Sequence, residues 1–150
     1  MTKAAEDPRT APAFLLAQEL RGFVGTLRRR LREQADGGDL TPSQTAVLLR
    51  LEKDGPATTS ALARAEGMRP QSMGAVIAAL EGAGLVAGAP DPADGRQTIL
   101  SLTDMCRAWI AQNRAARQDW LSRTIETRLS PDEQDRIAAA MALLRRLVGD

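Results

Sequence analysis

The chain has 150 residues, of which 43% are hydrophobic and only 3% aromatic, and it contains no Tyr or His. Helix formers such as Ala, Leu and Arg outnumber strand formers, so an all-β fold is not expected. The length suits one compact domain or a small domain with helical arms. The net charge of +1 does not by itself indicate a polyanionic partner, so any signal for DNA binding must be local.

Cysteine content and hydropathy indicate the compartment and exclude several function classes. The single cysteine, Cys106, excludes an intramolecular disulfide, and we expect it to be a small buried apolar residue rather than a redox switch. The chain shows no secretory signal and no apolar run of roughly 20 residues, so we expect a soluble cytoplasmic protein with no membrane association. We find no metal-ligand cluster, Gly-rich phosphate loop or activated nucleophile. We therefore expect no enzyme activity, no metal and no cofactor.

The N-terminal part contains a polar arm and one long helix. Residues 1–12 are polar and include Pro8 and Pro12, which predicts a flexible arm. Residues 13–35 form a helix, because apolar residues recur there with helical spacing. The apolar stripe consists of Leu16, Leu20, Phe23, Leu27 and Leu31. The basic run Arg28-Arg29-Arg30 with Arg32, near the helix end, is as compatible with a solvated last turn as with phosphate contacts.

Two shorter helices follow. The capping box Thr41-Pro42-Ser43-Gln44 begins the first of them, and Gly55-Pro56 ends it. Thr58 or Thr59 caps the second, which ends at Gly67. The apolar residues of these helices are Val47, Leu48, Leu51, Leu62 and Ala63.

A further helix and a hairpin complete the middle of the chain. Pro70 fits the first turn of this helix, which ends at Gly82. Its apolar face consists of Met73, Val76, Ile77 and Leu80. Residues 85–87 and 98–102 have the composition of two short strands, and the turn-rich segment 88–95 joins them.

Two helices are predicted at the C-terminal end. Thr103 caps a long helix that extends to Arg128, and the capping box Ser130-Pro131-Asp132-Glu133 opens another. The apolar residues of the last helix are Ile137, Met141, Leu144 and Val148. The apolar faces of the first, fifth and sixth helices are more than one small lobe can bury. A twofold dimer is the commonest way to cover such faces.

The helix that ends at Gly67 and the helix that begins near Pro70 predict a helix-turn-helix motif. In such a motif the second helix reads DNA. The first turns of such a helix enter the major groove, which brings Arg69, Gln71 and Ser72 to the bases and phosphates. The arginine fork matches two acceptors of guanine, and a glutamine amide matches adenine. The candidate phosphate ligands are Ser72 and Thr59. Small residues that allow DNA to approach the helix backbone are Gly74, Ala75 and Ala78.

The hairpin tip Asp94-Gly95-Arg96 adds a second candidate contact. Arg96 has the chemistry to enter the minor groove, and Asp94 has the chemistry to hold the Arg96 guanidinium through a charge-assisted hydrogen bond. Asp94-Gly95 is also a common tight-turn dipeptide, so the alternative is a simple turn with a solvated arginine. The position of the hairpin directly after a helix-turn-helix favours the DNA-binding interpretation.

A family resemblance spans nearly the whole chain and is strongest in several short motifs. They are Leu40-Thr41-Pro42-Ser43-Gln44, Leu62-Ala63, Leu80-Glu81 with Gly84-Leu85-Val86, Asp91-Pro92 with Asp94 and Arg96, and Leu102-Thr103. Their spacing resembles the multiple-antibiotic-resistance-regulator (MarR) family of bacterial winged-helix repressors. The resemblance implies a homodimer that binds a pseudopalindromic site in double-stranded DNA, and release from DNA by small anionic or phenolic compounds or by oxidants.

These observations define the expected architecture, which is mainly α with a small β-hairpin wing. A winged helix-turn-helix lobe, 40–103, lies between an N-terminal dimerisation helix, 13–35, and C-terminal dimerisation helices, 104–150. The expected function is a ligand-responsive repressor with a small aromatic or phenolic effector. Candidate residues for the effector pocket are Phe14, Phe23, Met105 and Trp109, together with Trp120. Burial in a dimer core is the alternative role for these side chains.

The charge of the expected lobe departs from that of a strong DNA binder. Residues 56–103 contain three basic and four acidic side chains, and Ala87-Gly88 stands where the family often has a basic residue. DNA affinity depends largely on phosphate neutralisation, so few phosphate contacts are expected. The alternative function is a winged-helix dimer that binds another protein and has weak or no affinity for DNA.

Overall fold

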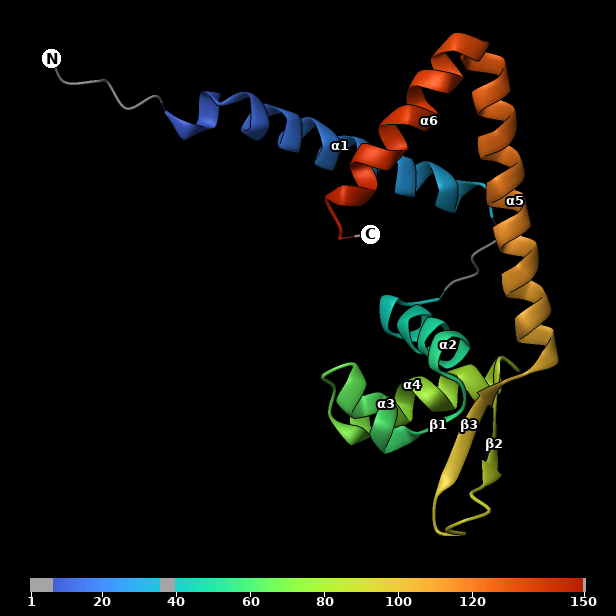
Figure 1. Ribbon diagram of the computed structural model, residues 1–150. Coiled ribbons are helices and arrows are strands. Elements are labelled where there is room, and N and C mark those ends of the chain that lie inside the picture. The colour runs from blue at the N-terminus through green and yellow to red at the C-terminus, as the bar shows by residue number, and fades with distance from the viewer. Residues whose placement is uncertain (1–6, 36–39, 150) are drawn as a thin grey trace, which may run out of the picture. The chain divides into compact units, whose positions relative to one another are not determined.

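The computed structural model describes residues 7–35 and 40–149 and divides the chain into two compact units (Figure 1). We call residues 1–36 with 115–150 the arm unit and residues 37–114 the lobe. The elements in chain order are η1 (Pro8–Thr10), α1 (Pro12–Glu33), α2 (Pro42–Asp54), β1 (Ala57–Thr58), α3 (Thr59–Ala65), α4 (Pro70–Gly82), β2 (Val86–Pro90), β3 (Thr98–Leu102), α5 (Asp104–Arg128) and α6 (Pro131–Arg146). This arrangement confirms a mainly α fold with a small β-hairpin wing.

The N-terminal segment is more regular than a flexible arm where it is described. Residues 8–10 form the short 3-10 helix η1, and the backbone N–H of Arg9 donates to Asp7 Oδ1 at 3.0 Å. Residues 1–6 of the predicted arm lie outside the described residues. Pro12 occupies the first turn of α1. Proline is tolerated there because backbone N–H groups in the first turn have no hydrogen-bond partner within the helix.

Helices α1 and α6 of the arm unit bury no residue within the chain. Many large apolar side chains of these helices are at least 40% exposed: Phe14, Leu15, Leu16, Phe23, Val24, Ile137, Met141 and Leu143. Leu147 and Val148, directly after α6, are also exposed. In the described part of the chain, no helix is long and apolar enough to cross a membrane. Exposed apolar surface of this extent typically marks an interaction site.

Reciprocal capping boxes begin α2 and α6, as the sequence predicts. Gln44 N donates to Thr41 Oγ1 at 3.2 Å, and Thr41 N donates to Gln44 Oε1 at 3.0 Å. Ser130 and Glu133 exchange the same two bonds at 3.2 and 2.8 Å. Each box satisfies two N–H groups that a helix start otherwise leaves without a partner.

The three strands of the lobe form an antiparallel sheet in the order β1-β3-β2. Strand β3 has the predicted bounds, but β2 continues to Pro90, where we expected a turn-rich segment after residue 87. Pro90 pairs with Thr98, and proline is tolerated there because β2 is an edge strand. We did not predict β1, because two residues are too few to show an alternating pattern.

The hydrophobic core lies in the lobe, between the helices and the sheet. Its buried members are Val47, Leu48, Leu51, Leu62, Ala63, Met73, Ile77, Leu80, Val86, Leu100, Leu102 and Cys106. Trp109 and Ile110 of α5 pack against this cluster while remaining half-buried. Burial of Cys106 confirms its expected role as a small apolar residue, and desolvation raises the pKa of its thiol, which keeps it neutral at pH 7.

Thr103 connects the end of α4 to the start of α5. Its hydroxyl donates to the carbonyl oxygen of Gly84 at 2.7 Å and accepts from the backbone N–H of Cys106 at 3.1 Å. Gly84 has a φ of 75°, a left-handed conformation that glycine adopts without a steric penalty. The hydroxyl therefore both caps α5 and fixes the chain at the point where α4 ends.

We expect Thr103→Val to lower the free energy of unfolding by about 1–3 kcal/mol, because it keeps the side-chain shape but leaves two backbone groups without their partner. Chemical denaturation measures the loss. Thr103→Ser is the matched control, since it keeps the hydroxyl, and its loss should be clearly smaller. Equal stability of the Val and Ser variants would show that the two hydrogen bonds contribute nothing.

Candidate nucleic-acid interface

The turn between α3 and α4 closes with a specific backbone motif at Gly67. Met68 N donates to the Ala63 carbonyl at 2.8 Å, and Gly67 N donates to the Arg64 carbonyl at 3.3 Å. Gly67 has a φ of 62°, so this is a Schellman C-cap with glycine in its usual left-handed position. The turn ends α3 at Ala65, two residues before the predicted end at Gly67, and α4 begins at Pro70.

Packing of α4 determines which of its side chains are available. Met73, Ile77 and Leu80 are buried against the lobe core, and Val76 is half-buried beside them. The side chains with the chemistry to contact DNA are exposed and lie in or directly before the first turns of α4: Arg69, Gln71, Ser72 and Ala75. Gly74 is half-buried, but a Cβ added there would meet no atom within 4 Å, so the space beside this position is open.

Thr58, and not Thr59, caps α3. Its hydroxyl oxygen accepts from Ala61 N at 3.2 Å. Thr59 is the first residue of the helix and is half-buried. A role for the Thr59 hydroxyl as a phosphate ligand therefore stays a prediction.

Backbone hydrogen bonds to two aspartates shape the tip of the β2–β3 hairpin. Asp91 Oδ1 accepts from Ala93 N at 2.9 Å, and Asp94 Oδ1 accepts from Arg96 N at 3.1 Å. We expected the Asp94 carboxylate to bind the guanidinium of Arg96, and this expectation was wrong. Among the described residues, Asp94 accepts from the backbone N–H of Arg96 and forms no ion pair with its side chain. The short aspartate side chain reaches a backbone N–H two residues ahead, as is usual in turns, and Arg96 remains exposed.

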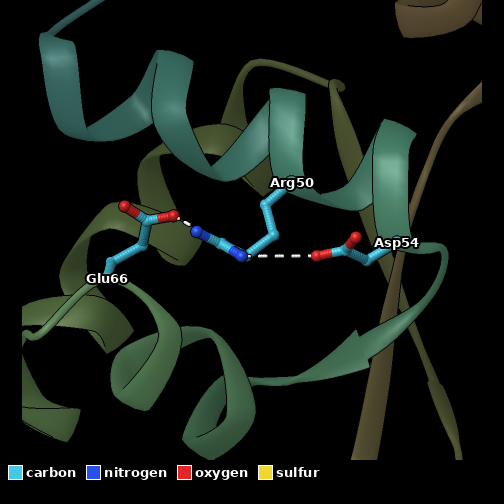
Figure 2. A network of polar contacts seen from close by, with 3 residues as sticks. All are labelled: Arg50, Asp54 and Glu66. Carbon is cyan, nitrogen blue, oxygen red and sulfur yellow. Dashed lines mark hydrogen bonds and ion pairs between the residues drawn. The ribbon is translucent and has the colours of Figure 1, made fainter. Parts of the chain in front are cut away.

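A partly exposed network of ion pairs links α2 to the turn between α3 and α4 (Figure 2). Arg50 Nε donates to Glu66 Oε1 at 2.6 Å, and Arg50 Nη1 lies 3.3 Å from Asp54 Oδ2. The hydrogen bond with Glu66 raises the pKa of Arg50 above its ordinary value, so Arg50 stays charged at any physiological pH. A second pair joins Glu52 of α2 to Arg114 of α5.

These pairs change the charge balance that we inferred from residues 56–103. That range includes Glu66 but excludes its partner Arg50, so it overstated the acidity of the surface. Residues 40–114 contain seven basic and seven acidic side chains, and Glu52, Asp54 and Glu66 lie in the ion pairs. Within the described residues, the lobe cations without an ion-pair partner are Lys53, Arg64, Arg69, Arg96 and Arg107.

The four residues predicted for an effector pocket belong to different units. Phe14 and Phe23 lie on α1 of the arm unit and are 40% and 59% exposed. Met105 of the lobe is exposed, and Trp109 packs against the lobe core. A common pocket for these side chains therefore stays a prediction.

The sequence reasoning missed the Arg50–Glu66 contact. Sixteen residues separate the two side chains, so no local pattern joins them. The available local signal was the spacing of Arg50 and Asp54, which are four residues apart on one helix and form an ion pair.

A helix-turn-helix followed by an exposed two-stranded wing defines a winged helix-turn-helix protein. The sequence model of the MarR family matches residues 40–98. The uncharacterized HTH-type transcriptional regulator Mb0904 of Mycobacterium bovis is 37% identical over 135 residues, which are 90% of this chain and 94% of that protein. The chain therefore belongs to the MarR family of HTH-type transcriptional regulators.

Solved structures have the same fold. A crystal structure assigned to a transcriptional regulator of Pseudomonas aeruginosa PA01 is 37% identical, with a TM-score of 0.79, and the match covers 94% of this chain and 99% of that one. A MepR mutant of S. aureus bound to an oligodeoxyribonucleotide has a TM-score of 0.70 at 18% identity, covering 89% of this chain and 97% of that one. At that identity the likeness concerns the fold alone.

Proposed function

We propose that this regulator binds a pseudopalindromic operator as a homodimer and represses transcription until a small aromatic or phenolic effector releases it. The observation that carries the proposal is the exposed set Arg69, Gln71, Ser72 and Ala75 at the start of α4, on a lobe that also carries Arg96 at its wing. The DNA-bound MepR mutant, which shares the fold, supports DNA as the partner.

The start of α4 is suited to the major groove. Its first backbone N–H groups have no intrahelical partner, and the helix dipole favours a phosphate near them. Arg69 directly precedes the helix, so its guanidinium extends from the end that approaches DNA. In this arrangement Arg69 and Gln71 contact base edges, while Ser72 contacts a phosphate.

The wing supplies the second contact. The hydrogen bonds to Asp91 and Asp94 hold the tip, and they leave the Arg96 side chain exposed. A minor groove that is narrow attracts arginine through its negative potential. Arg96 therefore adds affinity and orientation, whereas α4 adds sequence discrimination.

The exposed apolar faces of α1 and α6 support the homodimer. A twofold partner presents the same faces, so they can cover one another. Two lobes joined in this way contact two half-sites, and the operator repeats the symmetry of the protein. An effector that binds near the predicted residues Phe14, Phe23, Met105 and Trp109 would change the fluorescence of Trp109, which provides a direct readout of ligand response.

Binding to DNA upstream of the protein's own gene should show a shallow salt dependence. Arg64, Arg69 and Arg96 number six in two lobes. Even if each of them offset one phosphate charge, the slope of log K against log salt should be no steeper than about −5. Fluorescence anisotropy at several salt concentrations measures the slope. A much steeper slope would contradict this contact set, and no binding at any salt concentration would favour the protein-interaction alternative.

Substitutions at the wing and the reader helix should have different effects. Arg96→Ala should weaken binding to every operator sequence by a similar factor, because its contact carries little base information. Gln71→Ala should change the sequence preference, by about 1–3 kcal/mol at the base pair that it contacts. A panel of base-substituted operators measures both variants. The same pattern of losses for both would contradict the assignment of separate roles.

Leu16→Asp on α1 should dissociate the dimer, because Leu16 is 65% exposed in the single chain and belongs to the apolar stripe. Light scattering after gel filtration should give a mass near the 16.1 kDa of one chain for this variant and about twice that value for the wild type. Gln18→Asp introduces the same charge at an exposed polar position of α1 and should remain dimeric. A monomeric wild type would refute the proposed assembly.

A further inference from the structure

The ion pair between Arg50 and Glu66 lies directly before the start of α4. Glu66 is the C-cap residue of α3, and its backbone N–H donates to the Leu62 carbonyl at 3.0 Å. Its carboxylate accepts the 2.6 Å hydrogen bond from Arg50, and its side chain is only 21% exposed. The backbone therefore holds this residue from α3, while Arg50 holds it from α2 (Figure 2).

The residues after Glu66 lead directly to the candidate DNA contacts. Gly67 and Met68 make the Schellman turn, and Arg69 is the N-cap of α4. Only two residues separate Glu66 from Arg69, so a shift of Glu66 moves the start of the reader helix. Contacts of a few ångströms with base edges tolerate little displacement of this kind.

We propose that the Arg50–Glu66 bridge is a positioning contact, which fixes the first turn of α4 so that Arg69 and Gln71 can reach DNA. The inference rests on the proposed DNA-binding function and adds two residues outside the candidate set of DNA contacts. Arg50 also compensates the negative charge of Glu66, which stands between Arg64 and Arg69 in the chain.

Asp54 provides a matched control for this role. It pairs with the same guanidinium at 3.3 Å, but its side chain is 52% exposed and it lies at the end of α2, away from the turn in sequence. Glu66→Gln and Asp54→Asn each remove one negative charge. Electrostatic attraction to a polyanion alone would make both variants bind DNA more tightly. A positioning role predicts the opposite sign for Glu66→Gln.

The test measures operator affinity of the full-length variants by fluorescence anisotropy at two salt concentrations. Glu66→Gln should bind about threefold to tenfold more weakly than wild type, and Asp54→Asn should bind at least as tightly as wild type. Arg50→Ala, which also removes the pair with Asp54, is measured alone and combined with Glu66→Gln. The double variant should be no weaker than the weaker single variant, because the contact between Arg50 and Glu66 can be lost only once. Equal or tighter binding by Glu66→Gln, or an equal loss in Asp54→Asn, would overturn the proposal.

Hydrogen exchange in the free protein separates this inference from the proposed function. Glu66→Gln should speed exchange of the Gly67 and Met68 amides by at least about threefold, and Asp54→Asn should leave them unchanged. If the wild type binds no DNA, the proposed DNA-binding function is wrong. Unchanged amide exchange in Glu66→Gln would overturn the positioning role, whether or not the wild type binds DNA. If Glu66→Gln does not fold, Arg50→Lys replaces it, since lysine keeps the charge but lacks the fork that spans both carboxylates.

Discussion

Burial of one edge of α4 is the constraint on which the rest of the lobe depends. Met73, Ile77 and Leu80 lie in the core, and their spacing fixes the rotation of the helix about its own axis. With that rotation set, Gln71, Ser72 and Ala75 must face away from the core. The exposed side chains of the candidate interface are therefore a consequence of packing, because the same periodicity that builds the core determines which side chains stay exposed.

Packing sets the rotation of α4, but the turn before it sets where the helix begins. The Schellman motif at Gly67 and the bridge from Arg50 to Glu66 act on the same short segment from two directions. Thr103 has the corresponding role after the C-terminal end of α4, where its hydroxyl connects Gly84 to the start of α5 through two hydrogen bonds. Helix α4 is thus held at its core-facing side and at both ends. In the proposed function, this limits the conformational freedom that the helix has left to lose on binding DNA.

The sequence predicted those features of the fold and the candidate site that depend on neighbouring residues. The capping boxes at Thr41 and Ser130, the buried edge of α4 and the exposed set at its start all follow from local spacing. Contacts between distant residues were missed. Strand β1 forms only because β3 is available to pair with it, and Glu66 finds Arg50 across the fold. Asp94 was assigned the wrong partner because composition does not show whether a carboxylate reaches a side chain or the backbone.

The charge distribution has a consequence for specificity in the proposed function. Phosphate contacts raise affinity for all DNA equally, so a lobe with few unpaired cations gains little non-specific binding. Pairing of Arg50 and Arg114 with carboxylates removes two more cations from that general attraction. The ratio of specific to non-specific affinity then depends mainly on base contacts from Arg69 and Gln71. A modest charge at the interface is therefore compatible with selective binding, provided that the start of α4 is held accurately in place.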